Sequence, residues 1–227
     1  NSIMATLQLQ MNESLFLRNP QDTELGRRII DQSIKMIDDL GIEKFTFKRL
    51  AESIDSTEAS IYRYFENKHK LLVYLIAWYW NWLEYSIDFH TQNLSSPEAK
   101  LKTAIRIVTE KKHRDPLFPN IDEEVLQRIV INESDKTYLT KQVDEENEVG
   151  LFRGFKSLCS EIADIVLEIN PHYKYARALA STLLQASQQQ IFFAEHLPAL
   201  TNFEFEDDKH HKENSEFLFN LLIKAIS

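Results

Sequence analysis

A short stretch of this acidic chain is rich in side chains that bind phosphates and base edges. Within "FKRLAESIDSTEASIYRYFENKHKLL", residues 47–72, they are Lys48, Arg49, Ser60, Tyr62, Arg63, Tyr64 and Lys68. A guanidinium such as that of Arg63 can donate two hydrogen bonds to O6 and N7 of guanine, and a small residue such as Ala59 can contact a thymine methyl. Hydroxyls and ammonium groups hold phosphates. By residue type alone, the stretch fits a DNA-facing surface and an ordinary solvated helical hairpin equally well.

Two helices are expected before the residues that face outward. Apolar residues recur every three or four positions over residues 23–40, which predicts an amphipathic helix, and Gly41 ends it. Thr46 then precedes a second helix, whose inward residues are Phe47, Leu50, Ala51 and Ile54.

A third helix carries most of the candidate DNA contacts. Thr57 is expected to cap it, and Glu58 lies in its first turn, where a carboxylate favours the helix dipole. The sequence "EASIYRYF" predicts a helix over residues 58–65, after a four-residue break in which Asp55 tolerates an unusual backbone angle. This spacing matches a helix-turn-helix.

The segment resembles the DNA-binding head of the TetR family of transcriptional repressors. The resemblance covers residues 24–72 and rests on Thr46, the pair Leu50-Ala51, the run Ile61-Tyr62-Arg63-Tyr64-Phe65, and Asn67-Lys68 with Leu71. Two departures stand out, because the family's turn Gly-Val-Ser is Asp55-Ser56-Thr57 here and its helix-three glycine is Ala59. The negative charge and the added methyl group are both expected to alter operator affinity.

The resemblance implies a fold, a function and partners. It implies a homodimer, paired through C-terminal helices around residues 143–169 and 172–197, on a pseudo-palindromic double-stranded DNA operator with half-sites ~34 Å or a multiple apart. It implies a regulator, expected to be a repressor released by a small-molecule effector. The residues expected at the DNA are Thr46, Lys48, Arg49, Thr57, Glu58, Ala59, Ser60, Tyr62, Arg63, Tyr64 and Lys68.

Composition supports an all-α chain with a small head and a larger helical-bundle body. There are 4 Gly and 6 Pro in 227 residues, too few for the turns of a typical sandwich or doubly wound sheet. The net charge is −9, but residues 18–70 carry equal numbers of acids and bases. We expect a flexible arm over residues 1–20, a DNA-binding domain over 21–70, and an effector-binding and dimerisation domain over 71–227.

Other features predict a cytoplasmic protein without a membrane span. No apolar run reaches roughly 18 residues. The single Cys159 lies between apolar residues and is expected to be a buried packing thiol. In the body, helices are expected over residues 68–92, 97–113, 121–133, 143–169, 172–197 and 215–226.

An aromatic set in the body is a candidate effector pocket. Such a cavity would suit a bulky, largely apolar or planar ligand. Its members are Trp78, Trp82, Tyr85, Phe89, Phe118, Phe152, Phe155, Gln185, Gln189 and Phe192. The same spacing also fits plain hydrophobic core.

Rival functions find less support in the residues. Two Glu-x-x-His pairs, 66–69 and 110–113, would be needed on inward faces for a di-iron carboxylate bundle, but both lie in Lys-rich polar sequence. His210 and His211, in the acidic segment "DDKHHKE", are expected on a solvated loop rather than as metal ligands. No Gly-rich phosphate loop or nucleophile elbow is present. We therefore expect neither an enzyme nor a cofactor.

Overall fold

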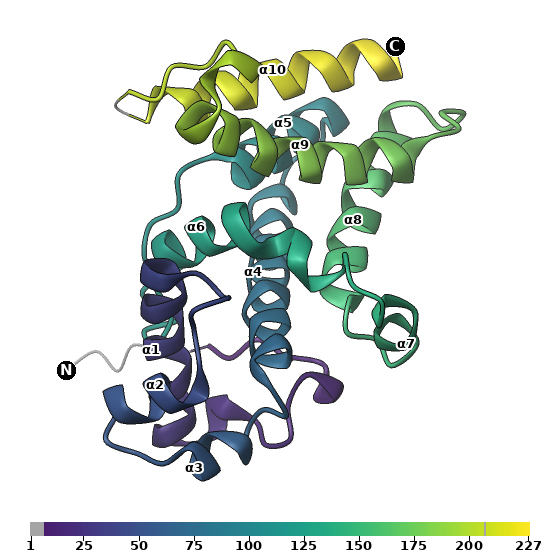
Figure 1. Cartoon of the computed structure of the whole chain (residues 1–227). Helices are drawn as coiled ribbons and strands as arrows, with labels where there is room; N and C mark the ends of the chain where they lie inside the picture. Colours follow the sequence, from purple (N-terminus) through teal and green to yellow (C-terminus); the bar gives the residue numbers. More distant parts are fainter. Residues whose placement is uncertain (1–6, 207) are drawn as a thin grey trace, which may run out of the picture. The chain divides into compact units, whose positions relative to one another are not determined.

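The structure, a computed structural model, describes residues 7–206 and 208–227. Within these ranges the chain is all-α, as predicted, with ten α-helices and no strand (Figure 1). The helices are α1 (Glu24–Leu40), α2 (Phe47–Ser53), α3 (Glu58–Tyr62), α4 (Lys68–Thr91), α5 (Pro97–Thr109), α6 (Glu123–Glu133), α7 (Val143–Glu148), α8 (Arg153–Ile169), α9 (Ala176–His196) and α10 (Lys209–Ile226). None of the helices in the described ranges could cross a lipid bilayer.

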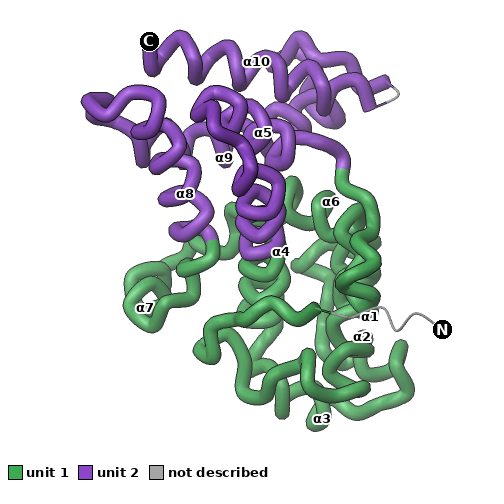
Figure 2. The backbone as a smooth tube through the Cα atoms, turned by 180° about the vertical axis from the view of Figure 1, so that it is seen from behind, with its two compact units in different colours: residues 1–79, 112–154 green, residues 80–111, 155–227 purple. Residues whose placement is uncertain are grey.

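The chain divides into two compact units (Figure 2). Unit 1 comprises residues 1–79 and 112–154, and unit 2 comprises residues 80–111 and 155–227. The predicted head, residues 21–70, lies wholly in unit 1. Helix α4 belongs to both units, and its residues 71–80 are all buried, as its apolar composition predicts.

Unit 1 is built around the helices of the head. Helix α1 buries Ile29, Ile30, Ile34 and Ile37, which are at most 3% exposed. Its end at Gly41, with φ of 76°, confirms the predicted stop, because that backbone angle is strained for residues with a side chain.

Helix α6 packs against α1 within unit 1. Arg128 on α6 donates two hydrogen bonds to the Asp38 carboxylate on α1, at 2.8 and 3.0 Å. Glu133 Oε1 accepts the backbone N–H of Ile42 at 3.2 Å. Lys136 follows the helix and pairs with Glu43 at 2.6 Å, and this hydrogen bond lowers the pKa of the Glu43 carboxyl. The end of α1 and the loop after it are thus held by groups about 90 residues further along the chain.

The amino-terminal segment lies against the rest of unit 1 where the sequence predicts a mobile arm. We call residues 7–22 the arm; residues 1–6 lie outside the described ranges. The backbone N–H of Leu7 donates to Leu117 at 3.0 Å, and that of Leu17 donates to Tyr64 at 2.7 Å. Leu15 is 2% exposed. The arm ends in a short 3-10 helix, η2 (Pro20–Asp22), which packs against α1.

Helix boundaries were wrong in the second half of the chain. The segment 143–169, in which at least one long helix was predicted, contains two helices, α7 and α8, because Gly150 adopts a φ of 83° and interrupts the helical backbone. Val149, directly before this glycine, is 50% exposed. The helix predicted over 172–197 begins at Ala176, and the one predicted over 97–113 ends at Thr109.

Unit 2 contains the packed helices α5, α9 and α10. Helix α10 begins at Lys209, six residues before its predicted start, so the expectation of a solvated loop around His210 and His211 was wrong. Both histidines are buried, at 2% and 9% exposure, and His211 Nδ1 lies 2.8 Å from the Thr109 carbonyl oxygen. In the part of the chain that is described, no group of three or more metal-ligating side chains occurs.

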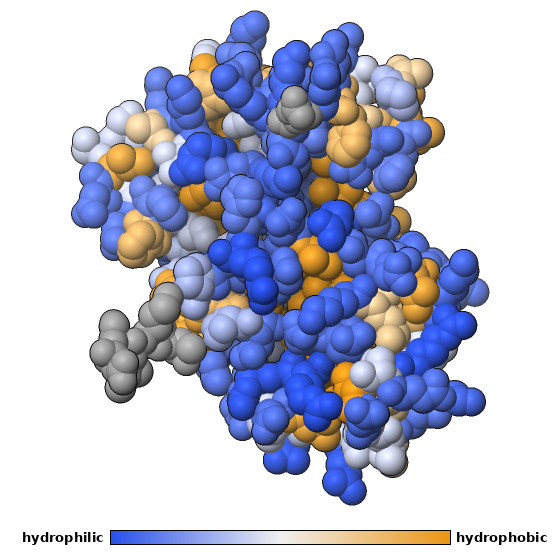
Figure 3. Space-filling model, turned by 90° about the vertical axis from the view of Figure 1, so that its left-hand side faces the viewer, coloured by the Kyte–Doolittle hydropathy of each residue, from blue (hydrophilic) through white to orange (hydrophobic). Residues whose placement is uncertain are grey.

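The protein surface is mainly hydrophilic on the face drawn in Figure 3, where apolar residues form separate patches. Cys159, predicted to be a buried packing thiol, is half-buried, and its Sγ lies 3.5 Å from the Arg177 carbonyl oxygen.

Candidate nucleic-acid interface

The turn between α2 and α3 is fixed by local interactions. Thr46 caps α2 by accepting the Arg49 N–H at 3.2 Å, and Thr57 caps α3 by accepting the Ser60 N–H at 3.2 Å. Asp55 adopts a φ of 50°, as its place in the break predicts. The N–H of Ser56 then donates to the carbonyl of Ala51 at 2.9 Å. The sequence predicts the helix start after Thr46, the Thr57 cap and the Asp55 angle, because each depends on residues only a few positions apart.

The buried side of α3 holds the helix on the core of the head. Ile61 and Phe65 are both 0% exposed. Helix α3 ends at Tyr62, three residues earlier than predicted, and continues as a turn in which the N–H groups of Tyr64 and Phe65 both donate to Ile61. Helix α2 packs against α3, so the two helices form the compact hairpin that the spacing predicts.

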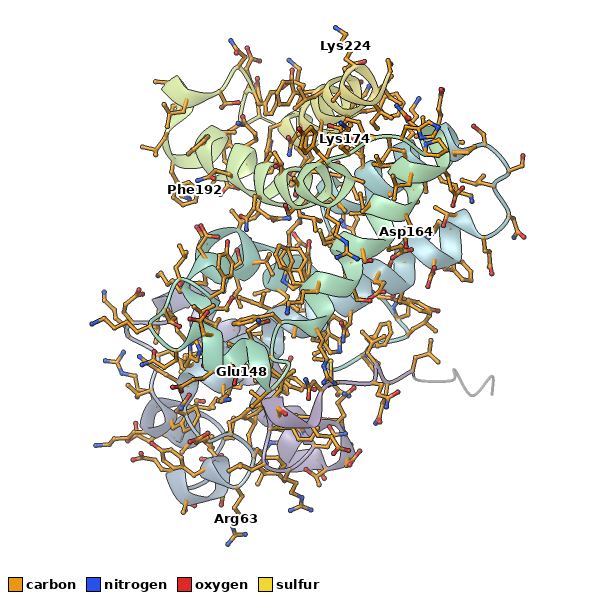
Figure 4. The ribbon with its side chains drawn as sticks, turned by 90° about the vertical axis from the view of Figure 1, so that its right-hand side faces the viewer. Arg63, Glu148, Asp164, Lys174, Phe192 and Lys224 are labelled. Carbon is orange, nitrogen blue, oxygen red and sulfur yellow. The ribbon has the colours of Figure 1, made fainter. Side chains whose placement is uncertain are left out.

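The outer side of the hairpin presents the predicted DNA-facing side chains. Ala59 and Arg63 are exposed, and Figure 4 shows Arg63 pointing away from the protein into solvent. Tyr62 is 48% exposed, and its ring lies edge-on to the Phe47 ring with ring centres 5.0 Å apart. The remaining predicted residues on the exposed side of the hairpin are Thr46, Lys48, Arg49, Thr57, Glu58 and the half-buried Ser60.

The electrostatics of this side are mixed. The cations Lys48, Arg49 and Arg63 share the hairpin's exposed side with the acids Asp55 and Glu58. Arg49 also donates to the Lys44 carbonyl at 3.2 Å, which holds its guanidinium near the start of α2. Cations and carboxylates are therefore both exposed on the hairpin.

Tyr64 does not lie where the sequence placed it. We expected its hydroxyl on the outward face, but the side chain is 2% exposed and the hydroxyl lies 2.7 Å from Thr23 Oγ1, at the cap of α1. The signal was available in the sequence, because Ile61, Tyr64 and Phe65 stand at i, i+3 and i+4 and share one helical face.

Lys68 is also held within the head. Its ammonium donates to the carbonyl oxygens of Ile42, Glu43 and Phe45, at 2.8, 3.1 and 3.1 Å. An ammonium has three N–H donors, so these bonds use all of them in the structure. The side chain therefore fixes the loop between α1 and α2 instead of projecting toward a phosphate.

One cation near α3 was missed by the sequence analysis. The guanidinium of Arg18, in the arm, lies over the Tyr64 ring with its carbon 5.5 Å from the ring centre. Arg18 is exposed, so it adds a positive charge beside the end of α3. Nothing in the local sequence pattern indicates this contact, which depends on how the arm folds back.

The aromatic residues predicted to form an effector pocket are distributed over both units. In unit 1, Trp78 meets Phe118 edge-on with ring centres 5.3 Å apart. In unit 2, Trp80 packs on Phe155 at 5.1 Å, and Phe89 is 58% exposed. The other predicted members are the buried Trp82, the half-buried Tyr85, Phe152, Gln185 and Phe192, and the exposed Gln189. A cavity found in unit 1 is lined by Trp78 and Phe118 but by no other member of the set.

The fold and the exposed hairpin define a helix-turn-helix DNA-binding protein. Residues 29–75 match the model of the family described as bacterial regulatory proteins, tetR family. The match covers about a fifth of the chain, and it makes the head similar to the bacterial transcriptional regulators of this family.

Solved structures with the same fold extend the likeness to most of the chain. The fatty acid degradation regulator FadR from Bacillus halodurans matches with a TM-score of 0.60 and 15% identity, over 86% of this chain and 92% of its own. AibR in complex with isovaleryl coenzyme A and operator DNA matches with a TM-score of 0.57 and 12% identity, over 86% of this chain and 97% of its own. The ketosteroid transcriptional regulator KstR2 of Mycobacterium tuberculosis matches with a TM-score of 0.55 and 12% identity, over 87% of this chain and 94% of its own. No curated protein sequence matches the chain.

Proposed function

We propose that the chain is a ligand-responsive repressor that acts in the cytoplasm as a homodimer on a pseudo-palindromic DNA operator. The observation that carries this proposal is the exposed side of α3, where Ala59, Tyr62 and Arg63 project from a helix that a capped turn and a buried core hold in place. A small residue beside an outward guanidinium suits close entry into a major groove and recognition of guanine.

The homodimer would use the C-terminal helices. Helices α8 and α9 correspond to the segments that the resemblance assigns to dimerisation, and α10 adds two exposed apolar side chains, Phe217 and Leu221. Both are 45% exposed and stand four residues apart, so they share one face of the helix. Apolar side chains that share an exposed helix face are a common feature of protein interfaces.

The effector is proposed to be a largely apolar or planar small molecule. The neighbouring structures support this class, because they include a complex with isovaleryl coenzyme A, a fatty acid degradation regulator and a ketosteroid transcriptional regulator. Helix α4 is one continuous helix with residues in both units, so a ligand that shifts α4 would change the spacing of the two α3 helices in the dimer. The ligand must bind the DNA-incompetent state more tightly, because otherwise the equilibrium does not move.

Fluorescence anisotropy would test DNA recognition. The purified protein would be titrated, over a range of salt concentrations, onto DNA from upstream of its own gene and onto an unrelated duplex. We expect preference for the upstream DNA, weaker binding at high salt, and a loss of about 1–3 kcal/mol of specific binding in Arg63→Ala. Arg106→Ala is the matched control, since Arg106 is an exposed arginine of unit 2, paired with Glu110.

The outcomes are distinct. Equal affinity of the wild type for both duplexes, or an Arg63→Ala variant with unchanged preference, would contradict the assignment of α3 as the recognition helix. Sedimentation equilibrium on the same samples would test the homodimer, and a monomer at the concentrations that bind DNA would contradict that part of the proposal.

A further inference from the structure

Unit 1 contains a cavity that the effector pocket predicted from sequence does not explain. Its volume is about 380 Å3, within the range of small-molecule sites. It lies between the arm, α1, the first half of α4 and the segment before α6. The residues that line it are Leu7, Gln8, Pro20, Gln21, Arg27, Ile30, Tyr74, Trp78, Phe118, Pro119, Asn120 and Ile121.

Buried apolar and aromatic side chains form much of the cavity wall. Ile30, Tyr74, Trp78 and Phe118 are each at most 4% exposed. The Trp78 and Phe118 rings are nearly perpendicular, with an interplanar angle of 85°, and so form a fixed corner. Such a corner fits an aromatic ring or a branched apolar group.

Arg27 supplies the one full charge among the residues that line the cavity, which include no Asp, Glu, Lys or His. Its Nη1 donates to the Gln21 carbonyl oxygen at 2.9 Å, which holds the guanidinium beside the cavity. Within the described ranges, Arg27 forms no ion pair with a carboxylate of the chain. Since a guanidinium has five N–H donors, several remain for a ligand anion.

Neutral polar groups complete the charged end of the cavity. The Tyr74 hydroxyl hydrogen-bonds with the Gln21 side chain, and burial raises the Tyr74 pKa well above its ordinary value, so the phenol stays neutral. The Gln21 amide also donates to the Leu9 carbonyl at 3.0 Å, and Gln8 donates to the Gln21 carbonyl at 3.2 Å. No carboxylate lines the cavity, and the charge of Asp22, which lies outside the lining, also raises the Tyr74 pKa.

We propose that this cavity binds a small carboxylate with an aromatic or branched apolar body. The carboxylate pairs with Arg27, and the body packs against Trp78 and Phe118. A planar guanidinium matches a carboxylate through two parallel hydrogen bonds, which favours this anion over a neutral polar group. The regulatory meaning of the site rests on the proposed function, whereas the binding itself does not require DNA.

The arm connects the cavity to the recognition helix within unit 1. Leu7 and Gln8 line the cavity, and further along the arm the Leu17 N–H donates to the carbonyl of Tyr64, directly after α3. A ligand that holds the arm in place therefore acts on the segment that follows Arg63.

Isothermal titration calorimetry without DNA tests the site. The probes are 3-phenylpropanoate and 3-methylbutanoate, each compared with its neutral amide. We expect saturable binding of at least one carboxylate, binding of its amide at least tenfold weaker, and at least a tenfold loss in Arg27→Met. Arg106→Met, which removes an arginine from unit 2, should leave the affinity unchanged. The absence of saturable binding by both carboxylates, or equal affinity for the carboxylate and its amide, would overturn the proposal.

A second variant keeps the test decisive if Arg27→Met does not fold. Gln8 is exposed at the edge of the cavity, so Gln8→Trp should fill the entrance without disturbing the core and should abolish carboxylate binding. Anisotropy on the upstream DNA separates the two proposals. In the wild-type protein, the absence of carboxylate binding together with specific DNA binding overturns the site, whereas carboxylate binding without any specific DNA binding overturns the proposed repressor.

Discussion

Glu123 is a buried carboxyl whose replacement by Gln should reveal a pH-dependent penalty in the folded protein. It is the first residue of α6 and is 0% exposed. Its Oε2 accepts the Asp115 N–H at 2.9 Å, whereas Oε1 is buried without a hydrogen-bond partner. Burial raises the pKa of Glu123 to about 8, and the negative charges of Asp115 and Asp122 also raise it.

The direction of the pH effect follows from proton linkage. The folded protein holds the Glu123 proton more tightly than the unfolded chain, in which the pKa is near its ordinary value of 4.5. The contribution of Glu123 to the free energy of unfolding is therefore fully present below about pH 4.5 and is lost as the pH rises toward 8. A difference of about 3.5 pKa units corresponds to about 5 kcal/mol, and relaxation around the charge reduces the expected loss to about 2–3 kcal/mol.

Glu123→Gln removes this penalty because the amide is neutral at every pH. The Gln carbonyl oxygen can accept the Asp115 N–H that Oε2 accepts now. We expect the variant to exceed the wild type in free energy of unfolding by about 2–3 kcal/mol at pH 9 and to match it within about 0.5 kcal/mol at pH 5.

Urea unfolding at pH 5, 7 and 9, at one protein concentration, measures the difference. Glu98→Gln is the matched control, because Glu98 stands in the first turn of α5 but is exposed. It should change the free energy of unfolding by no more than about 0.5 kcal/mol. If Glu123→Gln and the wild type differ in free energy of unfolding by the same amount at pH 5 and at pH 9, the reasoning is refuted.

Two further substitutions test the packing of the head. In Gly26→Ala, the new Cβ would collide with the Pro20 carbonyl oxygen, so we expect the free energy of unfolding to fall by about 1–3 kcal/mol and the arm to be proteolysed faster. An unchanged unfolding temperature would contradict the close approach of η2 to α1. In Lys68→Met, three carbonyl oxygens of residues 42–45 lose their donor, which should cost about 1–3 kcal/mol in urea unfolding, against little change in the exposed control Lys48→Met. Equal stability of the two lysine variants would show that Lys68 does not stabilise the loop.

Local interactions made the head predictable from sequence. Thr57 caps α3 as predicted, α2 begins directly after the capping Thr46, and Gly41 and Asp55 take the backbone angles expected of a helix end and a turn. Each of these features depends on residues within about four positions, so the pattern contains the necessary information.

Tertiary contacts decided what the local pattern left open. The sequence predicts that Lys68 binds a phosphate, but its ammonium donates to carbonyl oxygens that lie 23–26 residues earlier in the chain. The sequence predicts that His211 lies on a solvated loop, but its ring contacts the carbonyl oxygen of Thr109, 102 residues away. The periodicity of residues 143–169 continues through Gly150, although the backbone turns there. For Lys68 and His211 the deciding contacts come from groups distant in sequence, whereas the break at Gly150 is set by its backbone angle.

The sequence by itself determined the helical class, the hairpin and the exposed Arg63, because helix periodicity, caps and turn residues are local properties. The tertiary structure alone decided that the arm folds back on unit 1, and that Arg27, Trp78 and Phe118 line one cavity. These three side chains are as much as 91 residues apart in the chain. Chain spacing does not specify such a grouping, because it forms only when α1, α4 and the segment before α6 bury their apolar faces together.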